Sequence, residues 1–224
     1  MNQPYAMSLS TKRIMVVDDH PSTRDGLITR VALEPDLKVV GEASDVNEAI
    51  EVIGEVHPDL AVIDVSLKST SGIDLIKAVK ERFPSVKMLV WSMYEESLYA
   101  ERALRAGAMG YINKQQATDT IIDAIRTVLG GELFLSKALS ARILQQVVAG
   151  KKSGPVSPVE SLSNRELETF RLIGQGMATK EIAKAMCLSP KTIETYRARI
   201  KEKLQLDDIS SLTREATQWV LENG

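Results

Sequence analysis

The N-terminal half of the chain alternates short apolar runs with longer segments in which apolar residues recur every three or four positions. The apolar runs are 14–17, 37–40, 60–65, 86–91 and 109–112. Strands buried on both faces are apolar at nearly every position, so these runs predict strands of a parallel sheet. The intervening patterns predict helices at 22–33, 49–56, 73–83, 95–106 and 118–129. This order predicts an α/β doubly wound five-stranded parallel sheet with helices on both faces.

The C-terminal half shows helical spacing and no strand-like alternation. Its expected helices are 164–173, 179–186, 190–204 and 210–221. Ser163 with Glu166 three residues later is typical of a capping box, and Ser189 before Pro190 marks a second helix start. Gly174 and Gly176 lie where a helix should end. We therefore expect a second, all-α four-helix domain.

The stretch 150–158 (GKKSGPVSP) separates the two patterns and is typical of a linker. We expect a disordered leader at 1–12, a first domain at 13–132, a linker at 133–159 with a helix at 136–149, and a second domain at 160–224.

Composition excludes several classes of protein. With 28 Lys and Arg against 30 Asp and Glu, the net charge of −2 argues against a uniformly basic nucleic-acid coat. A membrane span needs about 20 apolar residues, and the sequence contains none. The leader lacks the features of a secretory signal. One cysteine and two histidines provide no multi-Cys zinc site or histidine cluster. We expect a cytoplasmic protein with no membrane partner.

Acidic residues follow two of the predicted strands. Asp18 and Asp19 follow the first run, and Asp64 lies in the third. Ligands bind beyond the carboxyl ends of strands in open α/β sheets, and three converging carboxylates suit Mg²⁺. A single Asp after a strand is more often a turn or helix-cap residue, but three at successive strand ends make that interpretation less favoured. Ser92 and Lys114 follow the fourth and fifth runs and suit an anion, so together the five residues indicate a site for a metal and a phosphoryl group.

At these positions, residues 13–132 resemble the receiver domain of bacterial two-component response regulators, which has a flavodoxin-like fold. The motifs that carry the resemblance are VVDDHPSTRDGL, AVIDVSLKSTSGIDLI, LVWSMYE and AGAMGYINK. The resemblance implies that Asp64 is the phosphoacceptor. It also implies that Asp18, Asp19, Asp64 and the backbone carbonyl of Ser66 bind Mg²⁺, and that Ser92, Lys114 and Tyr111 bind or respond to the phosphoryl group.

Two positions depart from the receiver pattern. Lys68 replaces a proline common in the family four residues after the phosphoacceptor, and Gln115 replaces a proline that often follows the lysine in a cis bond. Neither residue is expected to take part in the chemistry directly.

The segment 179–204 has helix-turn-helix spacing, and the second helix of this motif can enter a DNA major groove. At 100° per residue, Ile193, Ile200 and Leu204 form a buried stripe. Residues 189–204 carry five bases and two acids, a local charge of +3 that suits phosphates. An ordinary amphipathic helix with a solvated face would show a similar pattern, since two-helix turns are common outside DNA binding.

Residues 162–204 (LSNRELETFRLIGQGMATKEIAKAMCLSPKTIETYRARIKEKL) resemble the DNA-binding domain of the LuxR/NarL/FixJ family without a gap. The resemblance implies phosphate contacts from Lys180, Lys191 and Thr192, with Glu194, Thr195 and Ala198 facing base edges. Arg197 and Arg199 are expected to contact bases or phosphates. Glu194 has the chemistry to accept from a cytosine amine. The family commonly has His at the position of Tyr196.

Together the two resemblances predict a phosphorylation-controlled DNA-binding transcription regulator. The expected partners are double-stranded promoter DNA, a sensor histidine kinase or small phosphodonor, a second copy of the chain when active, and RNA polymerase. Phosphorylation would alter dimerisation and release the recognition helix. The expected dimer contacts are Ile209, Leu212, Ala216, Trp219 and Val220, although Trp219 is equally suited to the core.

Two alternatives are less favoured. An orphan regulator would not use Asp64, yet all five receiver positions are present. A phosphotransferase or phosphatase acting on outside substrates would need a covering cap, for which 13–132 has no insertion. We therefore expect no enzyme beyond a receiver that catalyses its own phosphorylation and dephosphorylation. A pure adaptor would leave the recognition-helix match unexplained.

Overall fold

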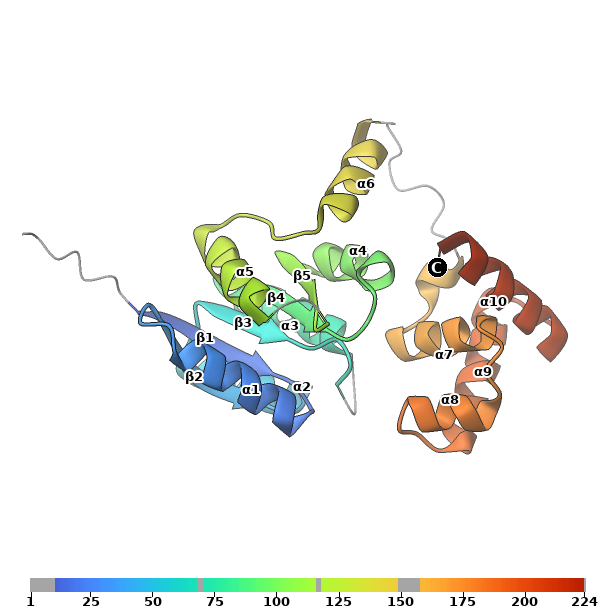
Figure 1. The fold of residues 1–224 in the computed structure, drawn as a ribbon. Helices are drawn as coiled ribbons and strands as arrows, with labels where there is room; N and C mark the ends of the chain where they lie inside the picture. The colour runs from blue at the N-terminus through green and yellow to red at the C-terminus, as the bar shows by residue number, and fades with distance from the viewer. Residues whose placement is uncertain (1–10, 68–70, 116–117, 149–157, 224) are drawn as a thin grey trace, which may run out of the picture. The chain divides into compact units, whose positions relative to one another are not determined.

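A computed structural model describes residues 11–67, 71–115, 118–148 and 158–223. The chain divides into two compact units, residues 1–140 and 141–224 (Figure 1). The leader 1–10, Lys68 and the linker residues 149–157 lie outside the described residues. Within the described part of the chain, no helix is long and apolar enough to cross a membrane.

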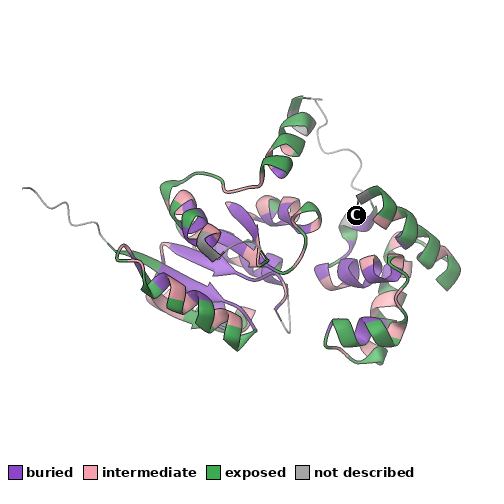
Figure 2. Cartoon of the chain, viewed as in Figure 1, coloured by how far each residue is buried: buried purple, intermediate pink, exposed green. Residues whose placement is uncertain are grey.

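The first unit contains a five-stranded parallel sheet. Its strands are β1 (Lys12–Val17), β2 (Leu37–Ala43), β3 (Leu60–Ile63), β4 (Lys87–Ser92) and β5 (Gly110–Asn113). They are ordered β2-β1-β3-β4-β5, and every neighbouring pair is parallel. All four residues of β3 are buried, because this central strand is covered on both faces (Figure 2). The predicted fold class is confirmed.

Five helices connect and cover these strands: α1 (Pro21–Ala32), α2 (Val46–Val56), α3 (Gly72–Arg82), α4 (Glu96–Ala106) and α5 (Thr118–Gly130). Leu27 of α1 and Ile125 of α5 share one apolar cluster with Ile14, Val62 and Leu89 of the sheet. Helices α2, α3 and α4 pack in succession against one another. Consecutive residues of β1, β3 and β4 are buried, so both faces of the central sheet are covered, whereas the edge strand β2 exposes Lys38 and Glu42.

Gly72 begins α3 directly beneath the end of β3. Its N–H donates to the Val65 carbonyl at 2.9 Å, and a Cβ at this position would overlap the backbone carbonyl of Asp64. Only glycine allows this close approach of the helix start to the strand end.

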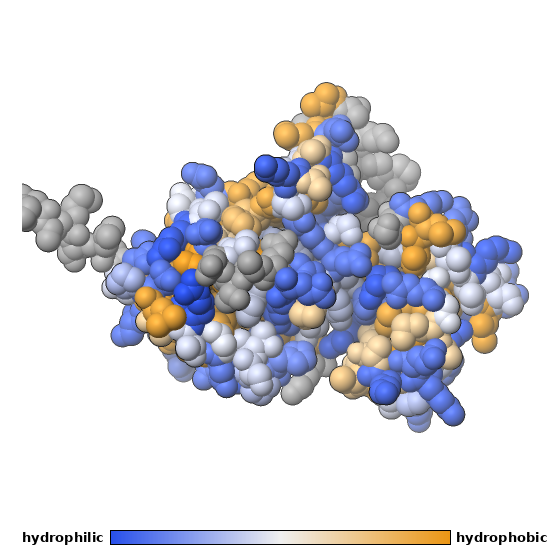
Figure 3. All heavy atoms as spheres, viewed as in Figure 1, coloured by the Kyte–Doolittle hydropathy of each residue, from blue (hydrophilic) through white to orange (hydrophobic). Residues whose placement is uncertain are grey.

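The helix α6 (Lys137–Val148) follows the receiver-like sheet. Its start is tied to α4, because the Ser136 N–H donates to a Glu96 carboxylate oxygen at 3.0 Å. Leu139 is buried, whereas Leu144 and Val148 are 63% and 85% exposed. Hydrophobic side chains on α6 are visible in Figure 3.

The second unit is entirely helical within its described residues. A short 3₁₀ turn (Pro158–Ser161) precedes α7 (Asn164–Gly174), α8 (Thr179–Ala185), α9 (Pro190–Leu204) and α10 (Ile209–Asn223). The predicted capping box is present, because Ser163 and Glu166 exchange backbone and side-chain hydrogen bonds at the start of α7. Ser189 caps α9, whose first residue is Pro190.

Candidate functional site

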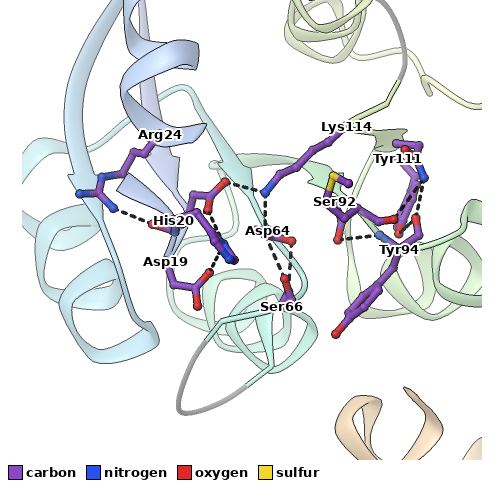
Figure 4. Close-up of polar contacts among 12 residues, drawn as sticks. Asp19, His20, Arg24, Asp64, Ser66, Ser92, Tyr94, Tyr111 and Lys114 are labelled. Atoms are coloured by element: carbon purple, nitrogen blue, oxygen red, sulfur yellow. Dashed lines mark hydrogen bonds and ion pairs between the residues drawn. The ribbon is translucent and has the colours of Figure 1, made fainter. Parts of the chain in front are cut away.

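The carboxyl ends of β1 and β3 bring three aspartates together. Asp18 and Asp19 follow β1, Asp64 follows β3, and these residues are 1%, 5% and 1% exposed. One ligand atom from each, together with one from His20, lies within 4.8 Å of all the others (Figure 4). Parallel strands produce this convergence because all their carboxyl ends lie at the same edge of the sheet.

Lys114, at the end of β5, provides the positive charge of this cluster. Its Nζ lies 2.6 Å from Oδ2 of Asp18 and 2.6 Å from Oδ2 of Asp64. The side chain is buried, and Nζ also lies 5.2 Å from the centre of the Trp91 ring. These charge-assisted hydrogen bonds offset the repulsion among the carboxylates.

The donor set fits a hard divalent cation. Carboxylate oxygens are the ligands that Mg²⁺ prefers, and three carboxylates in a buried cluster would gain from a second positive charge. Ser66 contacts Asp64 twice, through its N–H to Oδ1 and its hydroxyl to Oδ2, each at 3.1 Å. The His20 N–H donates to Oδ1 of Asp18 at 2.8 Å. These bonds fix the orientation of the Asp18 and Asp64 carboxylates.

Ser92 is the last residue of β4, and the loop that follows it is attached to β5. Ser92 is fully buried, and its Oγ accepts a long hydrogen bond of 3.4 Å from the Tyr94 N–H. The Tyr111 hydroxyl donates to the Tyr94 carbonyl at 3.0 Å, and the Asn113 amide donates to the same carbonyl at 3.1 Å. Burial raises the pKa of Tyr111, which keeps its hydroxyl protonated and able to donate.

Gln115 follows Lys114 without a cis bond, as no cis peptide occurs in the described residues. Its N–H donates to the Asn113 side chain at 2.8 Å. The departure from proline therefore leaves a donor that the loop uses locally.

The second unit presents an exposed basic helix. On α9, Lys191, Glu194, Thr195, Ala198 and Arg199 are exposed, as is Lys180 on α8. Thr192 is half-buried, and its hydroxyl lies 2.8 Å from that of Ser189 in the cap. The predicted base-facing residues therefore share one accessible face.

Arg197 differs from the other predicted DNA contacts. It is half-buried, and its Nη1 donates to the Thr179 hydroxyl of α8 at 3.0 Å. The Thr179 hydroxyl in turn donates to Oε1 of Glu194 at 2.8 Å. Arg197 is thus directed toward α8, and Thr179 joins it to the exposed face of α9.

The five expected dimer contacts on α10 are not equivalent. Ile209 is 55% exposed, and Trp219 and Val220 are half-buried. Leu212 and Ala216 are fully buried in the packing of α10 against α7. Trp219 lies 5.8 Å from the Phe170 ring, which gives it a place in the same core. Of these five residues, only Ile209, Trp219 and Val220 have exposed surface that a second copy of the protein could contact.

Sequence reasoning missed three residues that the structure brings to these sites. His20 directly follows Asp19, and its Nδ1 lies 2.7 Å from Oδ1 of Asp19. Asn113 shares the Tyr94 carbonyl with Tyr111, and Thr179 contacts Glu194. Adjacency could have indicated His20. No periodic signal links Thr179 to a residue 15 positions later.

Comparison with known families assigns both units. Residues 14–126 match the response regulator receiver domain, and residues 160–216 match the family described as bacterial regulatory proteins, luxR family. Among relatives, the oxygen regulatory protein NreC of Staphylococcus haemolyticus is 34% identical over 208 residues, covering 91% of this chain and 96% of the relative.

Solved structures agree with this assignment. A two-component response regulator of the LuxR family from Aurantimonas sp. SI85-9A1 is 33% identical with a TM-score of 0.58, covering 62% of this chain and 99% of that one. RcsB of Salmonella enterica serovar Typhimurium, bound to the rprA promoter with the phosphomimetic BeF₃⁻, is 25% identical with a TM-score of 0.57, covering 92% and 98%. A further RcsB structure contains two dimers on two parallel DNAs (25% identity, TM-score 0.56, covering 95% and 98%).

The fold and the paired domains define a class of transcription regulators rather than enzymes. The chain belongs to the LuxR family of two-component response regulators, which are phosphorylation-controlled, DNA-binding proteins.

Proposed function

We propose that Asp64 accepts a phosphoryl group from a sensor histidine kinase or a small phosphodonor, and that this controls binding of α9 to promoter DNA. The observation that carries the proposal is the cluster of Asp18, Asp19, Asp64 and Lys114. The buried Asp64 carboxylate is the nucleophile, and the Lys114 ammonium 2.6 Å away provides the positive charge that the transferred phosphoryl group needs.

In the reaction, a carboxylate oxygen of Asp64 attacks the phosphorus of the donor, the bond from phosphorus to the donor breaks, and an acyl phosphate forms. Lys114 exchanges its contact with the Asp64 carboxylate for one with the new phosphoryl oxygens. A Mg²⁺ ion held by Asp18, Asp19, Asp64 and the backbone carbonyl of Ser66 would neutralise charge on the transferred group. Hydrolysis by water breaks the acyl phosphate, which releases inorganic phosphate and returns Asp64 to its free carboxylate.

The phosphoryl charge then acts on the β4–α4 loop. The Ser92 hydroxyl moves toward a phosphoryl oxygen, and Tyr111, which contacts the Tyr94 carbonyl, responds to this movement. The new charge at Asp64 thereby shifts the equilibrium between two conformations of the β4–α4 loop and Tyr111. The output is a dimer on promoter DNA, with Ile209, Trp219 and Val220 at the dimer surface and RNA polymerase as a downstream partner.

On DNA, Lys180, Lys191 and Thr192 contact phosphates, and Arg199 contacts a phosphate or a base. Glu194, Thr195 and Ala198 face the base edges. We retain 13–132 as the receiver domain, 133–159 as the linker and 160–224 as the DNA-binding domain.

The proposal is tested by selecting DNA fragments from a random duplex library with the full chain. Samples contain Mg²⁺ with or without acetyl phosphate, and Asp64→Ala is compared with Asp25→Asn, which changes an exposed carboxylate of α1. We expect acetyl phosphate to enhance binding to a discrete sequence in wild type and Asp25→Asn but not in Asp64→Ala. Equal binding in all samples would show that phosphorylation of Asp64 does not regulate DNA binding. An absence of sequence-specific binding in every state would overturn the DNA-binding role.

A further inference from the structure

A chain of two hydrogen bonds crosses from the flank of α9 to its exposed face by way of α8. Arg197 Nη1 lies 3.0 Å from the Thr179 hydroxyl, which lies 2.8 Å from Oε1 of Glu194. Arg197 and Glu194 are both on α9, whereas Thr179 is the first residue of α8. These two hydrogen bonds therefore connect the two helices of the helix-turn-helix.

The chemistry of the three groups fixes the direction of both bonds. A guanidinium only donates, so the Thr179 oxygen must accept from Arg197. A carboxylate only accepts, so the single hydroxyl hydrogen of Thr179 must point to Glu194. Thr179 cannot turn this hydrogen elsewhere without losing the bond. The side chain of Glu194 is thereby held at one oxygen, Oε1, while the residue itself is exposed.

The environment of Arg197 supports a role inside the domain. Its Nε is buried and has no hydrogen-bond partner among the described residues, whereas Nη1 is committed to Thr179. Its charge lies one hydroxyl away from the Glu194 carboxylate. This offsets part of the repulsion that a carboxylate meets beside DNA phosphates.

We propose that Thr179 is a specificity-determining positioning residue, which holds Glu194 so that Oε2 accepts a hydrogen bond from the exocyclic amine of cytosine in the major groove. Arg197 acts through Thr179 rather than on DNA. This inference rests on the proposed DNA-binding function.

The base is chosen by its pattern of donors and acceptors. The major-groove edge of cytosine offers an amine donor, whereas guanine offers two acceptors and thymine one. Adenine also has an amine, but its N7 acceptor lies next to it and would repel a carboxylate. A carboxylate held at one oxygen therefore prefers cytosine and rejects guanine and thymine.

The test uses the full chain with Mg²⁺ and acetyl phosphate and the DNA sequence selected by wild type. Binding is then measured by fluorescence anisotropy on duplexes carrying each of the four base pairs at each position. The variants are Thr179→Val, which keeps the shape and removes the hydroxyl, Thr179→Ser, which restores it, and Glu194→Gln. Thr213→Val is the matched control, because Thr213 is exposed and its hydroxyl donates to the Ile209 carbonyl within the same helix.

We expect wild type to prefer cytosine at one position, and Thr179→Val to lose about 2- to 10-fold of that preference, the range of one hydrogen bond. Thr179→Ser and Thr213→Val should keep it. In Glu194→Gln, the Thr179 hydrogen can hold only the amide oxygen, which turns the amide NH₂ toward the base. The preference at this same position should therefore change from cytosine to a base with an acceptor. Adding Thr179→Val to Glu194→Gln should weaken this new preference.

Other results separate the possible failures. If wild type selects no sequence, the proposed function fails and this inference fails with it. If wild type selects a sequence and Thr179→Val shows the same preference for cytosine as wild type, only the positioning role of Thr179 is overturned. A uniform loss of affinity in Thr179→Val on every duplex, accompanied by a lower melting temperature, would also overturn it, because that is the signature of a structural residue. A preference for adenine at the Glu194-dependent position would overturn the choice of cytosine.

Discussion

Nζ of Lys114 lies 2.6 Å from Oδ2 of Asp64, the proposed phosphoacceptor. The same ammonium bonds Asp18 at 2.6 Å, so one cation from the end of β5 bridges carboxylates from the ends of β1 and β3. The reactive carboxylate is thus already paired with the group that is proposed to bind the incoming phosphoryl oxygens.

Replacing Lys114 by Met should destabilise the first unit by about 3 kcal/mol, because removal of one partner leaves buried charges without compensation. Mg²⁺ should restore more stability to Lys114→Met than to wild type, since the ion supplies the missing positive charge. Urea unfolding followed by Trp91 fluorescence in a Trp219→Phe background isolates this unit, as the chain has two tryptophans. Equal stability of the variant and wild type without Mg²⁺ would contradict the expectation.

Gly72→Ala should destabilise the first unit by about 2–3 kcal/mol, because the added methyl group overlaps the Asp64 carbonyl and forces the backbone to shift. Phosphorylation by acetyl phosphate should fall with it. Gly26→Ala is the matched control. Gly26 lies exposed inside α1 with open space around a Cβ, so this change should stabilise by about 0.5–1 kcal/mol. Urea unfolding checks the prediction, because the free energy of unfolding should fall in Gly72→Ala and rise in Gly26→Ala. An unchanged free energy of unfolding in Gly72→Ala would refute it.

The second unit should lose stability in acid through Glu166. Burial opposes ionisation of this carboxyl, but the Lys203 ammonium at 2.6 Å and the Ser163 N–H outweigh it and lower the pKa of Glu166. A lowered pKa in the folded state means that the stabilisation is fully present above the ordinary value of 4.5 and is lost as the pH falls through the folded value.

Lys203→Met should reduce this acid dependence, since it removes the partner that favours the charged form. Unfolding is followed by Trp219 fluorescence in a Trp91→Phe background between about pH 3 and 7. A parallel decline in wild type and variant across that window would show that another group is responsible. Lys201→Met, on the same helix, serves as the charge-matched control.

The strands were largely predictable because buried parallel strands leave continuous apolar runs. Prediction fell short at β2, where the apolar run ends at Val40 but the strand continues to Ala43. Gly41 and Glu42 are not apolar; pairing with β1 as far as Val17 extends the strand through them. Such an extension depends on the neighbouring strand and leaves no mark in the local pattern.

The candidate site was predictable where backbone topology alone places residues together. Asp18, Asp64 and Lys114 meet because each follows a strand of one parallel sheet. The direction of Arg197 was not predictable, because it lies on the flank of the buried stripe of α9. Whether such a side chain turns outward or toward α8 depends on how the two helices pack and on the presence of Thr179.

The Tyr94 carbonyl has a consequence for the amplitude of the proposed switch. It accepts from both the Tyr111 hydroxyl and the Asn113 amide, and the same amide donates to the Met93 carbonyl at 3.4 Å, so withdrawal of Tyr111 leaves the loop attached to β5 through Asn113. The β4–α4 loop would then shift while Asn113 holds it at the end of β5, instead of coming away from the sheet. Its movement is limited by the Asn113 contacts, and these same contacts allow the loop to return to its starting position once the phosphoryl group is lost.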